Sequence, residues 1–303
     1  MIHFTDADVD RALEGADLEG ALRDAFVALA EGRAALQERV RTDADGVKLS
    51  TLGGVLPGTG FAGAKVYTTI AGRFNFVIVL FSAQSGEPLA TFDANAITRR
   101  RTAAVSVIAA RRFAPATAES LAVFGTGTQA RAHVEAFRHA FPLRSVRVVS
   151  RSDARDFASD LRSTADFEVR VCAAREALDG ASLVVTATRS SAALFEGGWL
   201  CPGAFVAAVG SSKPDARETD DATLSRARAV VVEWKAQSLR EAGDLVLANP
   251  EILSRVPIID LGDALRTSGP MGREGGDVTL FKSVGVGLED VAAAGLAWQS
   301  RAR

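Results

Sequence analysis

The stretch Leu121-Ala-Val-Phe-Gly125-Thr-Gly127-Thr-Gln-Ala130 decides the fold. It joins a short apolar strand to the pattern Gly-x-Gly-x-x-Ala, and a helix is expected to follow through about His139. In such a turn the first glycine permits a tight bend, the second lets the backbone approach a pyrophosphate, and the alanine lets helix and strand pack closely. The N–H groups and positive dipole end of the helix then attract phosphates. The stretch therefore predicts a dinucleotide site.

Short, β-branched runs continue along the middle of the chain, most of them separated by segments long enough for a helix. Strands that alternate with helices form βαβ units, which build a parallel sheet covered on both faces. The predicted fold is α/β, with a Rossmann doubly wound parallel sheet, whereas residues 256–276 have the composition of a loop. We expect the strands at Leu121–Phe124, Ser145–Val149, Glu168–Cys172, Leu183–Thr188, Phe205–Val209 and Ala229–Trp234.

The first third of the chain has a different pattern. Asp6 or Asp8 can cap a helix that continues to Leu29. Apolar runs interrupted by glycine between Val47 and Phe92 predict a small, mostly antiparallel sheet. With 303 residues and a prior of about 150 residues per domain, two domains are favoured.

Composition excludes several classes of protein. The 35 basic and 37 acidic residues nearly cancel, so a general nucleic-acid binder is not expected. Cys172 and Cys201 are the two cysteines, too few for a disulfide framework or a thiolate zinc site, and no spacing suggests any other metal site. The acidic N-terminus does not resemble a secretory signal, and the apolar runs are far shorter than the roughly 20 residues that span a bilayer. We expect a cytoplasmic protein without a membrane partner.

The end of the second parallel strand bears on which dinucleotide is bound. NAD sites usually place an acidic residue there to bind the ribose, whereas a 2′-phosphate favours cations and hydroxyls. The sequence at this point is Ser150-Arg151-Ser152, and Asp153 follows only later. NADP(H) is therefore favoured, NAD(H) stays possible, and a solvated Arg151 in an ordinary loop is the alternative.

Arginines open a predicted helix over Arg99–Phe113 that Thr98 can cap. Cations at a helix N-terminus face the positive end of the dipole, so a negative group should compensate them. For Arg99 and Arg100, solvation or the acidic surroundings of Asp93 would be enough to compensate the charge. Arg101 lies on a face that turns inward and is the better candidate to bind a carboxylate in bidentate fashion.

Lysine is scarce, and two lysines lie in apolar runs where a charge is unfavourable unless it is paired. Lys65 lies within a predicted strand, although strand alternation could still point it outward. For Lys282, in Phe281-Lys282-Ser283, it is likewise open whether the side chain points inward or outward. The histidines His3, His133 and His139 are expected to be structural.

Taken together, the ordered motifs resemble the ornithine cyclodeaminase/mu-crystallin family. They are Gly86–Ala90, Asp93–Thr98, Arg101–Ala104, Gly125–Arg131, Thr186–Thr188, Trp199–Gly203, Val209–Gly210, Phe281–Gly285 and Glu289–Asp290. The resemblance implies a Rossmann NAD(P)-binding domain at residues 115–276. It also implies an α+β domain for substrate binding and dimerisation, at residues 1–114 plus 277–303, in a homodimer.

The resemblance further implies a clamp for the carboxylate of a small amino or imino acid. Lys65 and Arg101 match two members of the clamp, and Lys65 would also be the catalytic residue. The remaining arginine is Arg41, in Val40-Arg41-Thr42, with Arg39 as the alternative. The cofactor contacts implied are Thr102, Gly125, Thr126, Gly127, Thr128, Gln129, Ser150, Arg151, Ser152, Thr186, Ala187, Thr188, Val209 and Lys282.

Two departures from the family pattern bear on which reaction is expected. Family members that cyclise ornithine carry an aspartate and a glutamate where this chain has Ser212 and Gly54. At both positions, and at Ser150-Arg151-Ser152, the sequence is more similar to the ketimine reductase branch of the family. We expect an NAD(P)H-dependent oxidoreductase of small α-imino or α-amino acids. The alternatives are an ornithine cyclodeaminase, which forms proline and ammonia, and a non-catalytic NADPH-dependent protein that binds a small ligand.

Overall fold

A computed structural model describes residues 1–164, 166–269, 271–272, 274 and 277–301. The chain divides into two compact units. Unit 1 comprises Met1–Val105 and Gly285–Arg303, and unit 2 comprises Ser106–Val284. The chain passes from one unit to the other within helix α3 (Asn95–Phe113) and again after Val284. Unit 2 is thus a continuous segment, whereas unit 1 is assembled from both ends of the chain.

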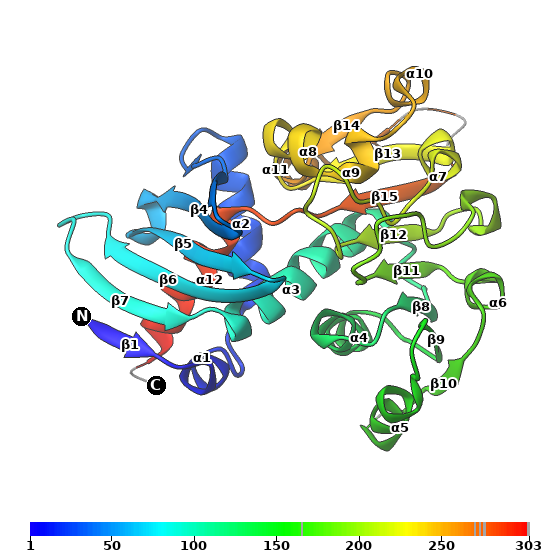
Figure 1. Cartoon of the computed structure of the whole chain (residues 1–303), viewed down its shortest axis with the longest axis horizontal. Coiled ribbons are helices and arrows are strands. Elements are labelled where there is room, and N and C mark those ends of the chain that lie inside the picture. Colours follow the sequence, from blue (N-terminus) through cyan, green and yellow to red (C-terminus); the bar gives the residue numbers. More distant parts are fainter. Residues whose placement is uncertain (165, 270, 273, 275–276, 302–303) are drawn as a thin grey trace. The chain divides into compact units, whose positions relative to one another are not determined.

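Unit 1 is built on a seven-stranded sheet in the order β1-β7-β6-β5-β4-β2, with β3 also paired to β4 (Figure 1). All pairs are antiparallel except β1 with β7. The predicted mostly antiparallel sheet is therefore present. Its strands are β1 (Ile2–Phe4), β2 (Ala35–Leu36), β3 (Val40–Ala44), β4 (Val47–Leu56), β5 (Phe61–Ile70), β6 (Arg73–Ser82) and β7 (Pro88–Asp93), and the short helix η1 (Pro57–Thr59) links β4 to β5.

Helix α12 (Gly287–Ser300) packs against β4, β5 and β6 and against α2 (Leu18–Ala30). Alternation on the strands explains which sheet face it covers, because Leu52, Ile78 and Leu80 point to the same side and are fully buried. On the opposite face of β4, Val47, Leu49 and Val55 are exposed. The core of unit 1 therefore lies between one face of the sheet and these helices.

The N-terminal helix predicted to reach Leu29 is two helices, α1 (Asp6–Ala12) and α2. Thr5, and not Asp6 or Asp8, is the N-cap of α1: its side chain accepts from the backbone of Asp8, whose carboxylate accepts from Thr5 in return. Asp17 caps α2. The predicted cap was wrong because Asp8 is the reciprocal partner in a capping box.

Unit 2 contains eight parallel strands in the order β10-β9-β8-β11-β12-β15-β13-β14 (Figure 1). The six predicted strands are present, and β14 and β15 were missed. The expected α/β fold with a doubly wound parallel sheet is confirmed. The strands are β8 (Ser120–Phe124), β9 (Ser145–Val149), β10 (Glu168–Val171), β11 (Leu183–Thr186), β12 (Phe205–Ala208), β13 (Ala227–Val232), β14 (Ile258–Asp260) and β15 (Val278–Lys282).

Helices connect these strands, and β11 and β12 are buried along their whole length, as expected for strands covered on both faces. Strand order reverses at β8, from which β9 and β11 lie on opposite sides. Such a reversal is where doubly wound sheets bind nucleotides. The helices are α4 (Thr128–Ala140), α5 (Arg155–Thr164), α6 (Ala174–Leu178), η2 (Gly197–Trp199), α7 (Asp221–Arg226), α8 (Lys235–Glu241), α9 (Gly243–Val246), α10 (Pro250–Leu253) and α11 (Leu261–Arg266).

The boundaries between the units differ from those expected at residues 114 and 277. Strand β15 pairs with both β12 and β13, so residues 278–284 belong to unit 2. The segment expected to be a loop contains β14 and α11, and its last residue, Gly276, lies outside the described residues. In the part of the chain that the structure describes, no helix is long and apolar enough to cross a bilayer.

Candidate functional site

The glycine-rich turn after β8 has the geometry that its sequence predicts. Gly125 has a φ of +107°, and a Cβ there would lie 2.6 Å from the carbonyl oxygen of Ala187, so the position requires glycine. Gly127 is the N-cap residue of α4, and a Cβ there would meet nothing within 4 Å. No side chain caps this helix among the described residues. The turn therefore leaves open space at a helix N-terminus, which suits a pyrophosphate, and the predicted contacts in it are Gly125, Thr126, Gly127, Thr128 and Gln129.

The loop after β9 lies beside this turn, because β8 and β9 are neighbouring parallel strands. Ser150 Oγ accepts from the backbone N–H of Ser152 at 3.2 Å, which folds the loop tightly. Arg151 is exposed, and no carboxylate in the described ranges is paired with it. The carboxylate of Asp153 instead binds Arg155, which holds the pKa of Asp153 below its usual value. The nearest acidic side chain is thus engaged by its own neighbour, and Arg151 is left available for an anion.

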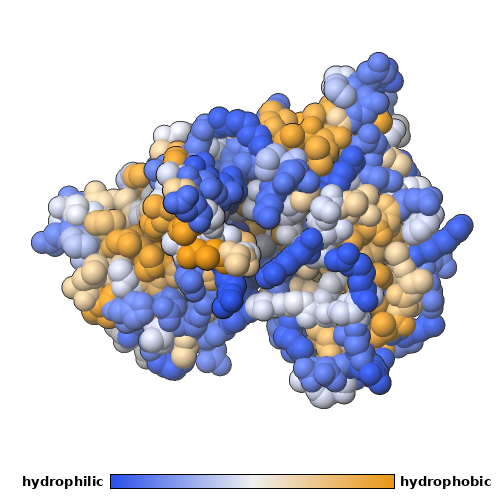
Figure 2. All heavy atoms as spheres, viewed as in Figure 1, coloured by the Kyte–Doolittle hydropathy of each residue, from blue (hydrophilic) through white to orange (hydrophobic). Residues whose placement is uncertain are grey.

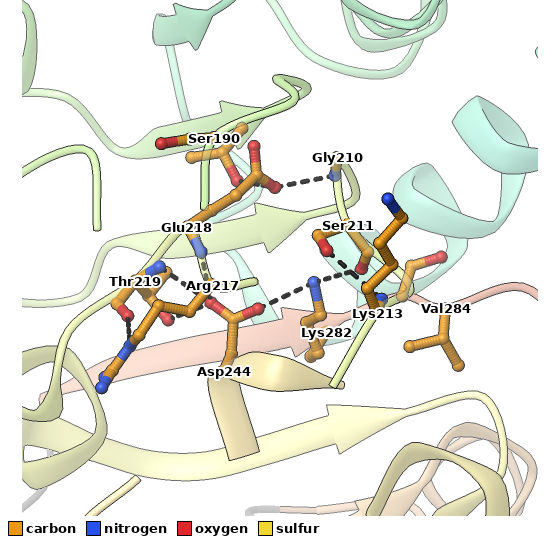
Figure 3. Close-up of polar contacts among 12 residues, drawn as sticks. Ser190, Gly210, Ser211, Lys213, Arg217, Glu218, Thr219, Asp244, Lys282 and Val284 are labelled. Atoms are coloured by element: carbon orange, nitrogen blue, oxygen red, sulfur yellow. Dashed lines mark hydrogen bonds and ion pairs between the residues drawn. The ribbon is translucent and has the colours of Figure 1, made fainter. Parts of the chain in front are cut away.

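A buried carboxylate that sequence reasoning missed joins the loops after β11 and β12. Glu218 is fully buried and accepts from Thr186 Oγ1 at 2.9 Å. It also accepts from Gly210 N at 2.7 Å (Figure 3). Its other oxygen accepts from the backbone N and Oγ1 of Thr188, at 2.9 Å and 2.6 Å. No local pattern marks Glu218, because its partners lie 8 to 32 residues away.

The predicted contacts Ala187 and Val209 lie at the ends of the same two strands. Ala187 N donates to the carbonyl of Phe124 in β8, and Val209 N donates to the carbonyl of Thr186. The ends of β8, β11 and β12 are thereby tied together. The residues predicted to contact the cofactor after these strands lie at one edge of the sheet.

Lys282 does not offer its ammonium group to a ligand. The side chain is fully buried, lies 2.9 Å from Asp244 Oδ2 and donates to the carbonyl of Ser211 at 2.8 Å (Figure 3). Asp244 also accepts from the backbone N–H groups of Glu218 and Thr219. Lys282 therefore anchors the loop after β12 from inside unit 2. Its predicted contact with the cofactor stays a prediction.

In unit 1, four charged side chains gather beneath the sheet. Lys65 points inward, since its cross-strand neighbours Leu52 and Ile78 are fully buried. Its Nζ lies 3.1 Å from Asp290 Oδ1. We name as the cation cluster Lys65, Arg101, Glu289 and Asp290, all at most 5% exposed, together with Arg39.

Arg101 completes the ion pairs of the cluster. Its Nη1 donates to Glu289 Oε2, and its Nε lies 3.4 Å from Asp290 Oδ1. The inward orientation predicted for Arg101 is what the structure shows. Arg99 and Arg100 bind the carboxylate of Asp10 in α1. Because α3 begins at Asn95, both arginines lie beyond its first turn.

Burial lowers the pKa of Lys65 from 10.5 to about 8. Asp290 opposes this change, whereas Arg101 and Arg39 lower the pKa further because they are like charges. With Lys65 protonated, the cluster contains three cations and two carboxylates. The excess positive charge favours the binding of one anion of low charge, such as a carboxylate.

The cluster forms because glycines let α12 approach β4 closely. A Cβ on Gly287 would lie 2.5 Å from the backbone nitrogen of Gly53, and one on Gly54 would lie 2.9 Å from the Cα of Leu288. The start of the helix therefore rests directly on the strand. Glu289 and Asp290 follow in the first turn of α12, and this brings their carboxylates to Lys65 and Arg101.

The two arginines considered for the third cation occupy different surroundings. Arg41 is exposed on β3, opposite Ser50. Arg39 is half-buried, donates to the carbonyl of Gly285 at 2.8 Å and lies close enough to Lys65 to lower its pKa. The structure thus brings Arg39 to the cluster, and the assignment of Arg41 as the third cation stays a prediction. Thr102, a predicted cofactor contact, is buried and donates to the carbonyl of Thr98.

No metal centre is apparent in residues 1–164, 166–269, 271–272, 274 and 277–301, where no three His, Cys, Asp or Glu side chains could share an ion. His133 is buried between Ser106 and the backbone of Gln129.

Known proteins resemble this chain over nearly its whole length. The ornithine cyclodeaminase/mu-crystallin family matches residues 3–301. The ketimine reductase mu-crystallin of Mus musculus is 37% identical over 74% of this chain and 68% of the relative. A Δ1-pyrroline-2-carboxylate reductase of Colwellia psychrerythraea is 32% identical over 72% of this chain and 70% of the relative. A crystal structure of a probable ornithine cyclodeaminase from Bordetella pertussis is 46% identical, with a TM-score of 0.94 over 99% of this chain and 96% of that one.

Proposed function

Because the chain belongs to the ornithine cyclodeaminase/mu-crystallin family, we propose that it is an NAD(P)H-dependent reductase of small cyclic imino acids with an α-carboxylate. The family predicted from its motifs is confirmed, and so is an NAD(P)-dependent oxidoreductase acting on small imino or amino acids. The choice of a cyclic imine follows relatives named ketimine reductase and Δ1-pyrroline-2-carboxylate reductase. The observation that carries the proposal is the cation cluster around Lys65, in which two buried ion-paired cations and the half-buried Arg39 face two buried carboxylates.

The cation cluster supplies two functions that such a reduction needs. Its excess positive charge would bind the substrate carboxylate, with Lys65, Arg101 and Arg39 as the donors. Lys65 Nζ, with a pKa of about 8, is mostly protonated at neutral pH and still able to release its proton. When bound, NAD(P)H supplies a hydride to the imine carbon. Lys65 would provide the proton that the imine nitrogen gains as the amine forms.

The test of this function is a panel of substrates with purified protein. Cyclic ketimine carboxylates should oxidise NADPH, with a rate that falls above about pH 8 as Lys65 loses its proton. Linear amino acids with NADP⁺ test the reverse reaction. NADPH binding without turnover of any imine would favour the non-catalytic binding protein and would refute the proposed reductase.

We propose NADP(H) as the preferred cofactor, held by the turn Gly125–Gln129 and by Ser150-Arg151-Ser152. Arg151 and two hydroxyls would bind the 2′-phosphate, and Asp153 is occupied by Arg155. The variant Arg151→Ala should raise the Kd of NADPH about tenfold, since a charge-assisted hydrogen bond is lost, and leave that of NADH unchanged. The exposed Arg170→Ala, on β10, is the matched control and should change neither Kd. Equal losses for NADPH and NADH with Arg151→Ala would contradict the preference.

An ornithine cyclodeaminase is the second candidate, because the Bordetella pertussis structure that is 46% identical bears that name. Two observations favour the reductase. Ser212 provides no carboxylate to activate water, and a side chain at Gly54 would meet the backbone of Leu288. Incubation with ornithine and NAD⁺ should yield no proline or ammonia. Proline formation without net NADPH change would instead establish the cyclodeaminase.

We propose a homodimer formed through the outer face of the sheet in unit 1. Figure 2 shows apolar residues gathered over this sheet. Exposed apolar residues on one sheet face are unfavourable in water. The exposed residues of β4 on this face are apolar, so the same face of a second copy is the matching partner. Leu49→Glu should convert a dimer to a monomer in light scattering. The exposed apolar residues of the face are Val40, Val47, Leu49, Val55, Ile70, Val77 and Phe81, each 36–51% exposed.

The cytoplasm is the proposed compartment. Cys172 and Cys201 are free thiols, which agrees with a reducing environment. Fractionation of the source cells, with detection of the protein by antibody, is the direct measurement.

A further inference from the structure

Strand order in the parallel sheet of unit 2 predicts where the two parts of a dinucleotide would bind. A doubly wound sheet binds one mononucleotide over each half, on either side of the reversal in strand order. The reversal is at β8, and Arg151 lies on the β9 side. If Arg151 takes the adenosine 2′-phosphate, as proposed, the nicotinamide half belongs over the carboxyl ends of β11 and β12.

Glu218 holds the loops at those two strand ends. Thr186 and Thr188 belong to the end of β11 and the loop after it, and Gly210 belongs to the loop after β12. All three donate to the one carboxylate, and Figure 3 shows the contact with Gly210. Glu218 thus sets the spacing of both loops.

A carboxylate is the side chain that these contacts require. Each oxygen of Glu218 accepts two donors, at 2.6–2.9 Å, so a neutral amide would direct its own N–H₂ group at donors. Gly210 also packs tightly on the group, because a Cβ there would lie 2.4 Å from Glu218 Oε1. The fit leaves no room for the loop to shift toward the carboxylate.

A second buried carboxylate fixes Glu218 itself. Asp244 accepts from the backbone nitrogen of Glu218 at 2.9 Å and from that of Thr219 at 2.8 Å, and Lys282 pairs with Asp244. Lys282 also donates to the carbonyl of Ser211, next to Gly210. A continuous network therefore runs from β15 to the loops after β11 and β12. Figure 3 shows its part from Lys282 through Asp244 and Glu218 to Gly210.

We propose that Glu218 is a positioning residue for the nicotinamide half of the cofactor, acting through the loops that it joins. It does not itself touch the cofactor, because it is fully buried beneath those loops. The proposal rests on the NAD(P)H-dependent activity and on the assignment of Arg151 to the adenosine half. It predicts that disturbing Glu218 affects the two halves of the dinucleotide unequally.

The test compares NADPH with 2′,5′-ADP, a fragment that lacks the nicotinamide, by calorimetry on the full chain. Glu218→Gln should raise the Kd of NADPH about tenfold and leave that of 2′,5′-ADP within about twofold. The matched control is Asp220→Asn, since Asp220 also accepts from backbone N–H groups but holds Gly197 and Thr223. That variant should change neither affinity.

Equal weakening of both ligands by Glu218→Gln, or no change in a folded variant, would overturn the proposal. If Glu218→Gln fails to fold, Thr186→Val replaces it, because the Thr186 hydroxyl is buried and donates only to Glu218 in the described structure. A smaller loss in the same direction is then expected, and its absence would refute the role. If NADH proves to be the preferred cofactor, the same comparison is made with NADH and ADP-ribose. A failure of the proposed NADP(H) preference is thereby distinguished from a failure of the role proposed for Glu218.

Discussion

Lys65 in unit 1 and Lys282 in unit 2 are both buried, and each is paired with one buried aspartate. Lys65 lies 3.1 Å from Asp290, and Lys282 lies 2.9 Å from Asp244. Their other neighbours differ. Lys65 shares Asp290 with Arg101, whereas Lys282 adds the carbonyl of Ser211 to its aspartate.

The difference decides what each lysine can do. Around Lys65, burial together with like charges lowers the pKa to about 8, so the ammonium can exchange a proton near neutral pH. Around Lys282, the cation helps to hold the pKa of Asp244 below its usual value, although burial acts to raise it. A buried lysine among other cations is suited to chemistry, and one that meets a carboxylate and a carbonyl is suited to anchoring a loop.

The largest expected effect is on turnover in Lys65→Met. Loss of the proton donor and of one carboxylate contact should lower kcat/KM for imine reduction by about a thousandfold or more. NADPH affinity, measured by fluorescence titration, should stay within about twofold, because the nucleotide turn belongs to unit 2. Retained turnover would remove Lys65 from the proposed mechanism.

Lys282→Met should instead act on stability. Removing the cation leaves the Asp244 carboxylate buried without its charge partner, which typically costs about 3–5 kcal/mol in the free energy of unfolding. Urea denaturation measures this, and the double variant Lys282→Met/Asp244→Leu should recover part of the loss. If Lys282→Met were as stable as the natural chain but inactive, the two lysines would not differ as described.

Asp290→Asn should move the pH profile of reduction. Asp290 raises the pKa of Lys65 by its charge and by a hydrogen bond, so its neutralisation lowers that pKa further. Reduction needs the protonated lysine, and the falling limb of kcat/KM should shift from about pH 8 to lower pH by about one unit. The exposed Asp43→Asn is the control, and an unmoved limb would show that another group titrates.

The smallest expected effect is on the KM for the imine, and it distinguishes the two arginines considered as the third cation. Arg39→Ala should raise KM for the imine about fivefold by removing one cation from the cluster, and should raise the pKa of Lys65 because a like charge is lost. Arg41→Ala, on exposed β3, should change neither quantity. The reverse result would restore Arg41 as the third cation.

Sequence patterns predicted what depends on local geometry. The turn at Gly125 and Gly127 follows from backbone conformation, and the six parallel strands follow from their apolar runs. The motifs also singled out Lys65 and Arg101, which the structure brings together. Those residues lie within continuous segments whose local pattern carries the information.

Partners that are distant in the sequence could not be predicted in the same way. Glu218 and Asp244 look like surface acids in the sequence, and burial by remote segments gives them their role. The orientation of Lys65 depended on strand register, and β15 was missed because it lies beside a segment with loop composition. Arg39 and Arg41 differ by only two residues, and the tertiary fold alone separates them.

The contribution of α12 to unit 1 has a consequence for biosynthesis. Lys65 is separated from its aspartate by 225 residues, and Arg101 from Glu289 by 188. A chain that emerges from its N-terminus therefore carries these cations without their carboxylates until α12 leaves the ribosome. We expect unit 2, which is continuous, to become resistant to protease on stalled nascent chains before unit 1 does.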